Sequence, residues 1–364
     1  MPFLAAALLL TLTTTASPSL DLVDEVTGPR GCAPRLLGSE HHPFIEAQIA
    51  CDAFLGLAIV GEALGGKTET PAAIVAVRRL LADAKGRGAT AFEKSPASIL
   101  RRGYQLLLYS GLGRLKGLTA EEAAAYDTLA RAIAADVEAA APAFVESFNQ
   151  QFWPCDSSPA AAGLVLHGSL RGDEKTRAAG LGLVKRLEER RLAQGGFVTK
   201  VDGKGGTLEA TPRGTVMAWT AGFLALAGVP EARAFADDLF ARFCGRDVLI
   251  LGVKAPASCR EWPRDVDRKA DAVSGPIVDG QGTGASALAI AAFRATGRTD
   301  DADRLTSLAA VAAPAFALMG KPVHQGPLER AILLWGASAR SWATARPTDA
   351  TAPARRPAAT DAAQ

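Results

Sequence analysis

The sequence has few aromatic residues and almost no net charge. Phe, Trp and Tyr make up 6% of the chain, so few rings are available to stack against nucleobases or sugars. Lys and Arg number 40 against 38 Asp and Glu, and the resulting charge of +2 offers no basic surface for nucleic acid. With 48% hydrophobic residues, the composition predicts a globular protein that binds no nucleic acid.

Several catalytic and metal-binding motifs are also missing. The chain has no Gly-x-Ser-x-Gly elbow, Walker phosphate loop or His-Glu-x-x-His sequence, so serine hydrolase, NTPase and zinc-protease functions lose their main support. The five cysteines include no Cys-x-x-Cys pair and lie at no zinc-ligand spacing from a histidine. We therefore expect no metal and no cofactor.

An apolar run covers residues 3–16 and ends in small residues before Ser17 and Pro18. A membrane-spanning helix needs roughly 20 apolar residues, so this run is too short and we expect no stable membrane span. Its length and ending are typical of a signal peptide, here residues 1–18, which predicts a secreted or periplasmic protein. Because no Lys or Arg precedes Phe3, a cytoplasmic protein with an apolar N-terminus is the alternative.

The cysteines can form disulfides if the protein is exported. Cys32 with Cys51 and Cys244 with Cys259 are close in sequence and would each close a short loop, which leaves Cys155 as the odd thiol. The alternative is five reduced and buried side chains, since free cysteine is among the most buried residue types.

Helical periodicity dominates the rest of the chain, and no run alternates convincingly as a strand would. The expected helices cover residues 43–64, 72–85, 97–113, 119–148, 157–170, 174–192, 212–227, 230–243, 282–297, 299–313 and 325–342. Residues 345–364 are rich in Ala, Pro and Thr, and we predict that they form a disordered tail.

The expected helices come in pairs joined by tight turns that contain Gly. A helical hairpin cannot bury its apolar face alone, so hairpins stack, and closure into a ring removes the need for capping repeats. We therefore predict an all-α fold in which residues 19–344 form a single α/α toroid of five or six hairpins. Longer loops would gather at one mouth of the ring, where a pocket should lie. They cover residues 149–157, 193–211, 245–281 and 314–325, and the second is expected to add a small hairpin.

One of these loops contains Trp153, Cys155 and Asp156 just before a predicted helix. A thiol at a helix N-terminus has a lowered pKa, and the neighbouring carboxylate could transfer a proton. Simple capping of the helix by Asp156 or Ser157 is the alternative.

A second loop, residues 259–276, has four carboxylates and four cations within thirteen residues. It could supply a general acid, a base and an orienting arginine beside Trp262. We expect Glu261 and Asp271 to transfer protons and Arg260 to bind substrate. A solvated loop whose ion pairs contribute little is the alternative.

The hairpin pattern over residues 40–342 resembles the α/α-toroid group, which includes six-hairpin glycosidases, polysaccharide lyases and linalool dehydratase/isomerase-like proteins. The Trp153–Asp156 stretch, the Pro212-Arg213-Gly214 helix start and residues 271–276 are similar to loops of bacterial toroid proteins near the dehydratase/isomerase branch. The resemblance implies Asp and Cys in a pocket at the ring mouth, which Asp156 and Cys155 would supply. The tyrosine of that branch has no counterpart in the long loops.

These observations predict an exported acid/base enzyme, a hydrolase or lyase acting on a small molecule or glycan. The catalytic candidates are Asp156, Glu261, Asp271 and Cys155. The substrate-binding candidates are Trp153, Arg213, Arg260, Trp262 and Gln325. The alternative function is a non-catalytic envelope protein that binds or assembles through its charged loop.

Overall fold

The computed structural model describes residues 17–28, 31–32, 45–91, 98–148, 150–193, 195–250, 252–266, 268–270, 274–318 and 326–343. Most of the predicted signal peptide and the predicted tail lie outside these residues. The described chain is mostly helical, in agreement with the all-α prediction. None of its helices combines the length and the hydropathy that a transmembrane span requires.

Twelve α-helices lie in the described part of the chain. They are α1 (Pro18–Val26), α2 (Ile45–Leu64), α3 (Thr70–Ala91), α4 (Ile99–Arg114), α5 (Ala120–Ala140), α6 (Ser158–Arg171), α7 (Glu174–Glu189), α8 (Gly214–Leu226), α9 (Ala232–Phe243), α10 (Thr283–Ala295), α11 (Thr299–Leu318) and α12 (Pro327–Ser338). α2 to α12 correspond to the predicted helices, whereas α1 was not predicted. α5 ends eight residues before the expected residue 148, because Pro142 cannot continue a helix.

Three short antiparallel hairpins interrupt the helices. β1 (Lys200–Val201) pairs with β2 (Thr207–Glu209), β3 (Cys244–Ile250) with β4 (Val253–Cys259), and β5 (Ile277–Val278) with β6 (Gln281–Gly282). The first confirms the small hairpin expected within residues 193–211. The other two correct the prediction that residues 245–281 form a loop.

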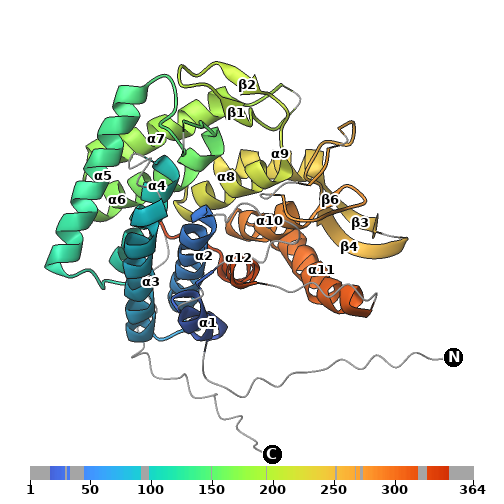
Figure 1. Cartoon of the computed structure of the whole chain (residues 1–364), viewed down its shortest axis with the longest axis horizontal. Coiled ribbons are helices and arrows are strands. Elements are labelled where there is room, and N and C mark those ends of the chain that lie inside the picture. The colour runs from blue at the N-terminus through green and yellow to red at the C-terminus, as the bar shows by residue number, and fades with distance from the viewer. Residues whose placement is uncertain are drawn as a thin grey trace, which may run out of the picture.

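The even-numbered helices contact one another in chain order. α2 contacts α4, and the contacts continue through α6, α8 and α10 to α12, which returns to α2. Each odd-numbered helix packs on one or two members of this cycle, as α3 does on α2 and α4. Figure 1 shows α5 and α7 at one edge of the molecule and α11 at another, with α2, α8 and α12 between them.

The distribution of apolar residues explains why the even-numbered helices form the inner cycle and the odd-numbered helices pack on it. All but one of the thirteen residues of α8 are buried, and eleven of the fourteen in α6. By contrast, six of sixteen are buried in α7 and five of twelve in α9. A helix that is apolar all round belongs in a core, whereas an amphipathic helix covers it.

Aromatic rings fill the space between the even-numbered helices. Phe54 of α2, Tyr104 of α4, Trp219 and Phe223 of α8, and Trp335 of α12 form one cluster, with ring centroids 5.1 to 6.2 Å apart in neighbouring pairs. Each such pair adds about 0.5–1.5 kcal/mol beyond its buried area. The cluster therefore links helices that are far apart in the chain.

The longer connections precede the even-numbered helices and meet at one end of the helix set. Ser98, before α4, donates to the carbonyl of Ser147 in the connection before α6. Phe152 of the same connection pairs with Val201 in the connection before α8. The connection before α10 in turn bonds to the start of α8. We call this end, made by the starts of α4, α6, α8 and α10 and the connections before them, the mouth.

Both predicted disulfides are present. Cys32 is bonded to Cys51 of α2, and Cys244 to Cys259 across paired positions of β3 and β4. Cys155 is free and buried. The second disulfide, together with the packing of β4 on α10 and α11, holds a hairpin whose sequence lacks clear alternation.

The disulfides can be counted by mass spectrometry. Denatured but unreduced protein should take up one alkyl group, at Cys155, and reduced protein should take up five. The control Cys155→Ser should take up none before reduction. Uptake of five groups by unreduced wild-type protein would contradict the pairing.

Gly103 of α4 tests the close packing of neighbouring even-numbered helices. A Cβ there would lie 2.7 Å from the backbone nitrogen of Ala160 in α6, so Gly103→Ala should reduce the free energy of unfolding by about 1–3 kcal/mol. At Gly182 of α7, a Cβ would meet nothing within 4 Å. The control Gly182→Ala should therefore keep stability unchanged or raise it by up to about 1 kcal/mol. Equal stability of the two variants in urea denaturation would argue against this packing.

Candidate functional site

A buried ion pair lies at the start of α8. Arg213 is the N-cap residue of α8, and its Nε donates to Glu261 Oε1 at 2.6 Å. The two side chains are 3% and 0% exposed. The structure thus brings together two predicted site residues that are 48 positions apart.

Glu261 also caps α8. Its Oε2 accepts a hydrogen bond from the backbone nitrogen of Thr215 at 3.2 Å, and its Oε1 accepts from Thr215 Oγ1 at 2.8 Å. Its carbonyl oxygen accepts from the Gly214 nitrogen at 2.8 Å. The Arg213 side chain makes no capping bond, so a distant carboxylate satisfies amides that the helix leaves without partners. Both carboxylate oxygens of Glu261 are thus bonded to protein groups.

Two glycines let the Glu261 segment pass between α8 and α10. A Cβ on Gly214 would lie 2.0 Å from the carbonyl oxygen of Arg260, and one on Gly282 would lie 3.1 Å from the Cβ of Glu261. Larger residues at either position would push the segment away from the helix starts. Thr215 was not singled out in the sequence, because its role depends on this passage.

Burial dominates the electrostatics of Glu261. It raises the pKa of this carboxyl above its ordinary value, against the opposing charge of Arg213 and the hydrogen bonds from Thr215 and Arg213. A buried charge is costly unless it is paired and hydrogen-bonded. The charge of Arg213 and the hydrogen bonds from Arg213 and Thr215 therefore offset part of the cost of burying the Glu261 carboxylate.

Two cations lie close to the Trp262 ring. The guanidinium carbons of Arg213 and Arg268 are 4.7 and 5.1 Å from its ring centroid. Arg268 also forms an ion pair with Glu209 of β2. Arg268 therefore links the charged loop, residues 259–276, to the β1–β2 hairpin. The sequence of the loop did not indicate this contact, because it contains many charges.

Cys155 and Asp156 lie in the 3-10 turn η1 (Pro154–Ser157), which contacts α4, α6 and α8. Cys155 Sγ donates to Asp156 Oδ1 at 3.6 Å, and the two residues are 6% and 9% exposed. Burial raises the pKa of the Cys155 thiol well above its ordinary value, Asp156 adds to the rise, and the charge of Arg213 opposes it. The expected lowering of this pKa by a helix N-terminus is therefore wrong, because burial outweighs it.

Capping of the following helix by Asp156 or Ser157 was the alternative role of this segment. Ser157 does not perform it. It is the N-cap residue of α6, yet its side chain makes no capping bond. Its Oγ is buried without a hydrogen-bond partner, as are Nε1 of Trp153 and Nε1 of Trp262. The Nε1 atoms of all five tryptophans lack a partner, so at the mouth it is Ser157 Oγ and Gln281 Oε1 that stand out.

The other substrate-binding candidates are less closely associated with Arg213. Trp153 is half-buried, with Lys200 Nζ 5.8 Å from its ring centroid. Arg260 donates from Nε to the Trp262 carbonyl at 3.3 Å, and its guanidinium packs on Gly280 in the β5–β6 turn. Asp271 and Gln325 lie outside the described residues. Within those residues, no group of three potential metal ligands is present.

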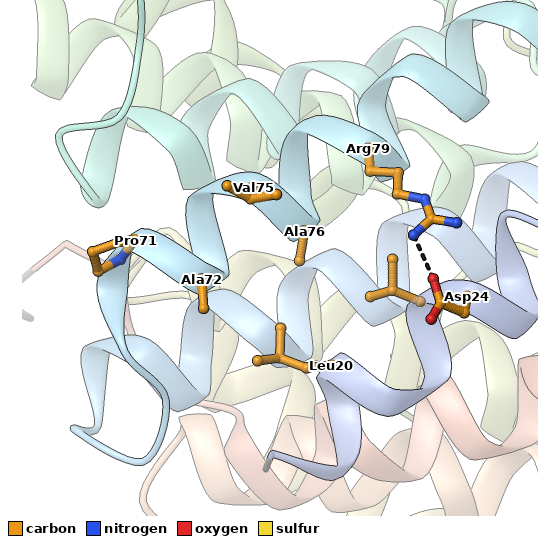
Figure 2. Close-up of a pocket in the computed structure, with 8 residues that line it drawn as sticks. Leu20, Asp24, Pro71, Ala72, Val75, Ala76 and Arg79 are labelled. Atoms are coloured by element: carbon orange, nitrogen blue, oxygen red, sulfur yellow. Dashed lines mark hydrogen bonds and ion pairs between the residues drawn. The ribbon is translucent and has the colours of Figure 1, made fainter.

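Two hollows of the described chain bear on the choice of a site, and the second lies partly on the connection before α8. One is a groove between α1 and α3, lined by apolar side chains such as Leu20 and Val75, with the ion pair between Arg79 and Asp24 at one side (Figure 2). The other lies between α7 and α9 and includes Asp238. Neither contains a predicted site residue.

No protein-family model matches the chain, and no curated protein matches its sequence. The assignment of a function therefore depends on the geometry of the mouth.

Removing the charge of Glu261 tests the ion pair. Glu261→Gln should reduce the free energy of unfolding by about 3–5 kcal/mol, because it leaves Arg213 buried without this counter-charge. Glu138 provides a control, since its surface pair with Lys175 has side chains 52% and 73% exposed. Glu138→Gln should cost less than about 1 kcal/mol. Similar losses for the two variants in urea denaturation would contradict a stabilising role for the pair.

Proposed function

We propose that the protein is an exported α/α-toroid enzyme that performs acid/base chemistry of the lyase type at the mouth. The cycle of contacts from α2 to α12 and back, with the odd-numbered helices packed on it, supports a ring of six helical hairpins. The two disulfides support export, because such bonds persist in oxidising compartments. The substrate would be a small molecule with a hydroxyl or anionic group.

The observation that carries the proposal is the contact of η1, which contains Cys155 and Asp156, with α8, whose N-cap residue is Arg213. Arg213 is a buried cation whose charge acts on the Cys155 thiol, and that thiol is bonded to Asp156. In the proposed site, Arg213 orients the hydroxyl or anionic group and Asp156 transfers the proton. Cys155 is held as a neutral thiol by burial, so it would act as a hydrogen-bond donor and not as a nucleophile.

The unsatisfied polar atoms at the mouth support a polar ligand there. A buried donor without a partner costs about 1–3 kcal/mol, so its presence calls for an explanation. Ser157 lies in η1, Trp153 directly precedes it, and the Trp262 ring lies 4.7 Å from the Arg213 guanidinium. A substrate with hydroxyl or carboxylate oxygens would provide acceptors for them, and the indole rings would provide its apolar wall.

The bonding of Glu261 favours a lyase over a glycosidase. Glycoside hydrolysis requires two carboxyl groups roughly 5 to 10 Å apart that are available to the substrate. Because the oxygens of Glu261 accept from Arg213 and Thr215, we assign Glu261 the role of positioning Arg213. A second catalytic carboxyl would then have to come from Asp271. Elimination of water from an alcohol can proceed with Asp156 as the one acid/base carboxyl.

A binding or assembly function is the second candidate. It is favoured by exposed charges on the loop after Trp262, namely Arg264, Asp265, Arg268 and Lys269. Such a surface suits a polar interface and requires no proton transfer. Turnover of a substrate distinguishes the two functions.

Asp156→Asn tests the enzyme proposal. The purified protein would be assayed with terpene alcohols and with uronic-acid oligosaccharides, and alkene formation would be measured. Asp156→Asn should reduce the rate at least about 100-fold, since general acid/base groups contribute 10²–10⁴-fold. Asp303→Asn on α11, where the side chain is 67% exposed, should keep the wild-type rate. An unchanged rate with Asp156→Asn would remove this residue from the mechanism, and binding without turnover by the wild type would favour the second candidate.

A further inference from the structure

Glu62 is a buried carboxylate that accepts hydrogen bonds from hydroxyl groups. It lies in the last turn of α2 and is 8% exposed. Its oxygens accept hydrogen bonds from three hydroxyl groups, those of Ser17, of Ser19 at 2.8 Å and of Thr68 at 3.1 Å. Among the described residues, no Lys, Arg or His forms an ion pair with it.

This environment differs from that of two other buried acids in the chain. Glu261 is paired with Arg213, and Asp301, 4% exposed, is paired with Arg298. A buried carboxylate is costly without a counter-charge, and hydroxyl groups supply hydrogen bonds but no charge. Among the described residues, Glu62 therefore has hydrogen bonds but no ion pair, although the Arg340 guanidinium lies against Gly65 just after α2.

Ser17 lies where a positive group could be placed. It is the first described residue, is 7% exposed, and donates from Oγ to Glu62 Oε2. Covalent geometry keeps the backbone nitrogen of a serine within about 4 Å of its own Oγ in any rotamer. The nitrogen of Ser17 is thus held close to the Glu62 carboxylate.

The preceding sequence is suited to cleavage at this residue. The apolar run of residues 3–16 ends in Thr14-Thr15-Ala16, with small residues at the first and third positions before Ser17. This is the pattern that precedes the bond cut by a signal peptidase. In a chain exported before it folds, this bond would be accessible before Ser17 becomes buried.

We propose that a signal peptidase hydrolyses the Ala16–Ser17 bond and that the new α-ammonium group of Ser17 becomes the counter-charge of Glu62. Water adds across the peptide bond, which leaves a carboxylate on Ala16 and an amine on Ser17. The amine takes up a proton at neutral pH, because an α-amino group has a pKa of about 7.7–8.0. The inference rests on the export part of the proposed function and is independent of the enzyme activity. It also shortens the predicted signal peptide from 18 to 16 residues.

The ion pair would anchor α1. This helix packs on α2, α3 and α12 through buried side chains that include Leu22 and Val26. A charge pair between its first residue and the last turn of α2 would fix the end of α1 that has no side-chain cap. Processing would then contribute to the stability of the folded protein as well as to its release.

The first experiment is N-terminal sequencing and intact-mass measurement of the full chain, expressed with its own leader in an exporting bacterium. We expect an N-terminus of Ser-Pro-Ser-Leu and a mass that lacks residues 1–16. Retention of Met1, in any compartment, or cleavage at another bond would overturn the proposal. An absence of enzyme activity would leave this result unaffected.

The second experiment tests the ion pair with two purified forms, one beginning at Ser17 and one that retains residues 14–16. The form beginning at Ser17 should melt a few degrees higher, and Glu62→Gln should abolish this difference. Glu69→Gln, at an exposed neighbouring position, should preserve it. Equal melting temperatures of the two wild-type forms, or a difference that persists in Glu62→Gln, would overturn the role of Glu62. The wild-type comparison holds even if Glu62→Gln fails to fold.

Discussion

The buried ion pair between Arg213 and Glu261 is the interaction on which the geometry of the mouth depends. It caps α8, joins that helix to the segment after β4, and holds the Arg213 guanidinium against Trp262. The disulfide at Cys259 fixes the chain two residues before Glu261. A pair so far from water is costly to break, so Arg213 is held rigidly, as is required of a cation that stabilises charge in a substrate.

At two places in the fold, a buried carboxylate forms hydrogen bonds with the start of a helix that is distant in the sequence. Glu261 is bonded to the first turn of α8, and Glu62 in the last turn of α2 is bonded to the start of α1. Each receives hydroxyl groups, but Arg213 supplies a charge to Glu261 alone. With the proposed processing, the Ser17 ammonium gives Glu62 the same kind of partner. At both sites, a buried ion pair would then attach a distant segment to an even-numbered helix.

The order of α2 to α12 could be predicted because apolar spacing and Gly or Pro boundaries are local signals. α1 was missed because it is short and directly follows the apolar run of residues 3–16. The β3–β4 hairpin was missed because the Cys244–Cys259 bond and packing on α10 and α11 hold it, and neither leaves an alternating pattern. Arg213 and Glu261 could also be predicted from the sequence as candidate site residues. Their pairing, the capping by Glu261 and the raised pKa of Cys155 depend on burial and on contacts between distant segments.

Crystals of the protein soaked with small alcohols and carboxylates provide the most direct test of a substrate site at the mouth. We expect bound compounds to place their oxygen atoms at Arg213 and Asp156, with their apolar parts against Trp262. Compounds that bind only in the groove between α1 and α3, or beside Asp238, would contradict a substrate site built on the Arg213–Glu261 pair.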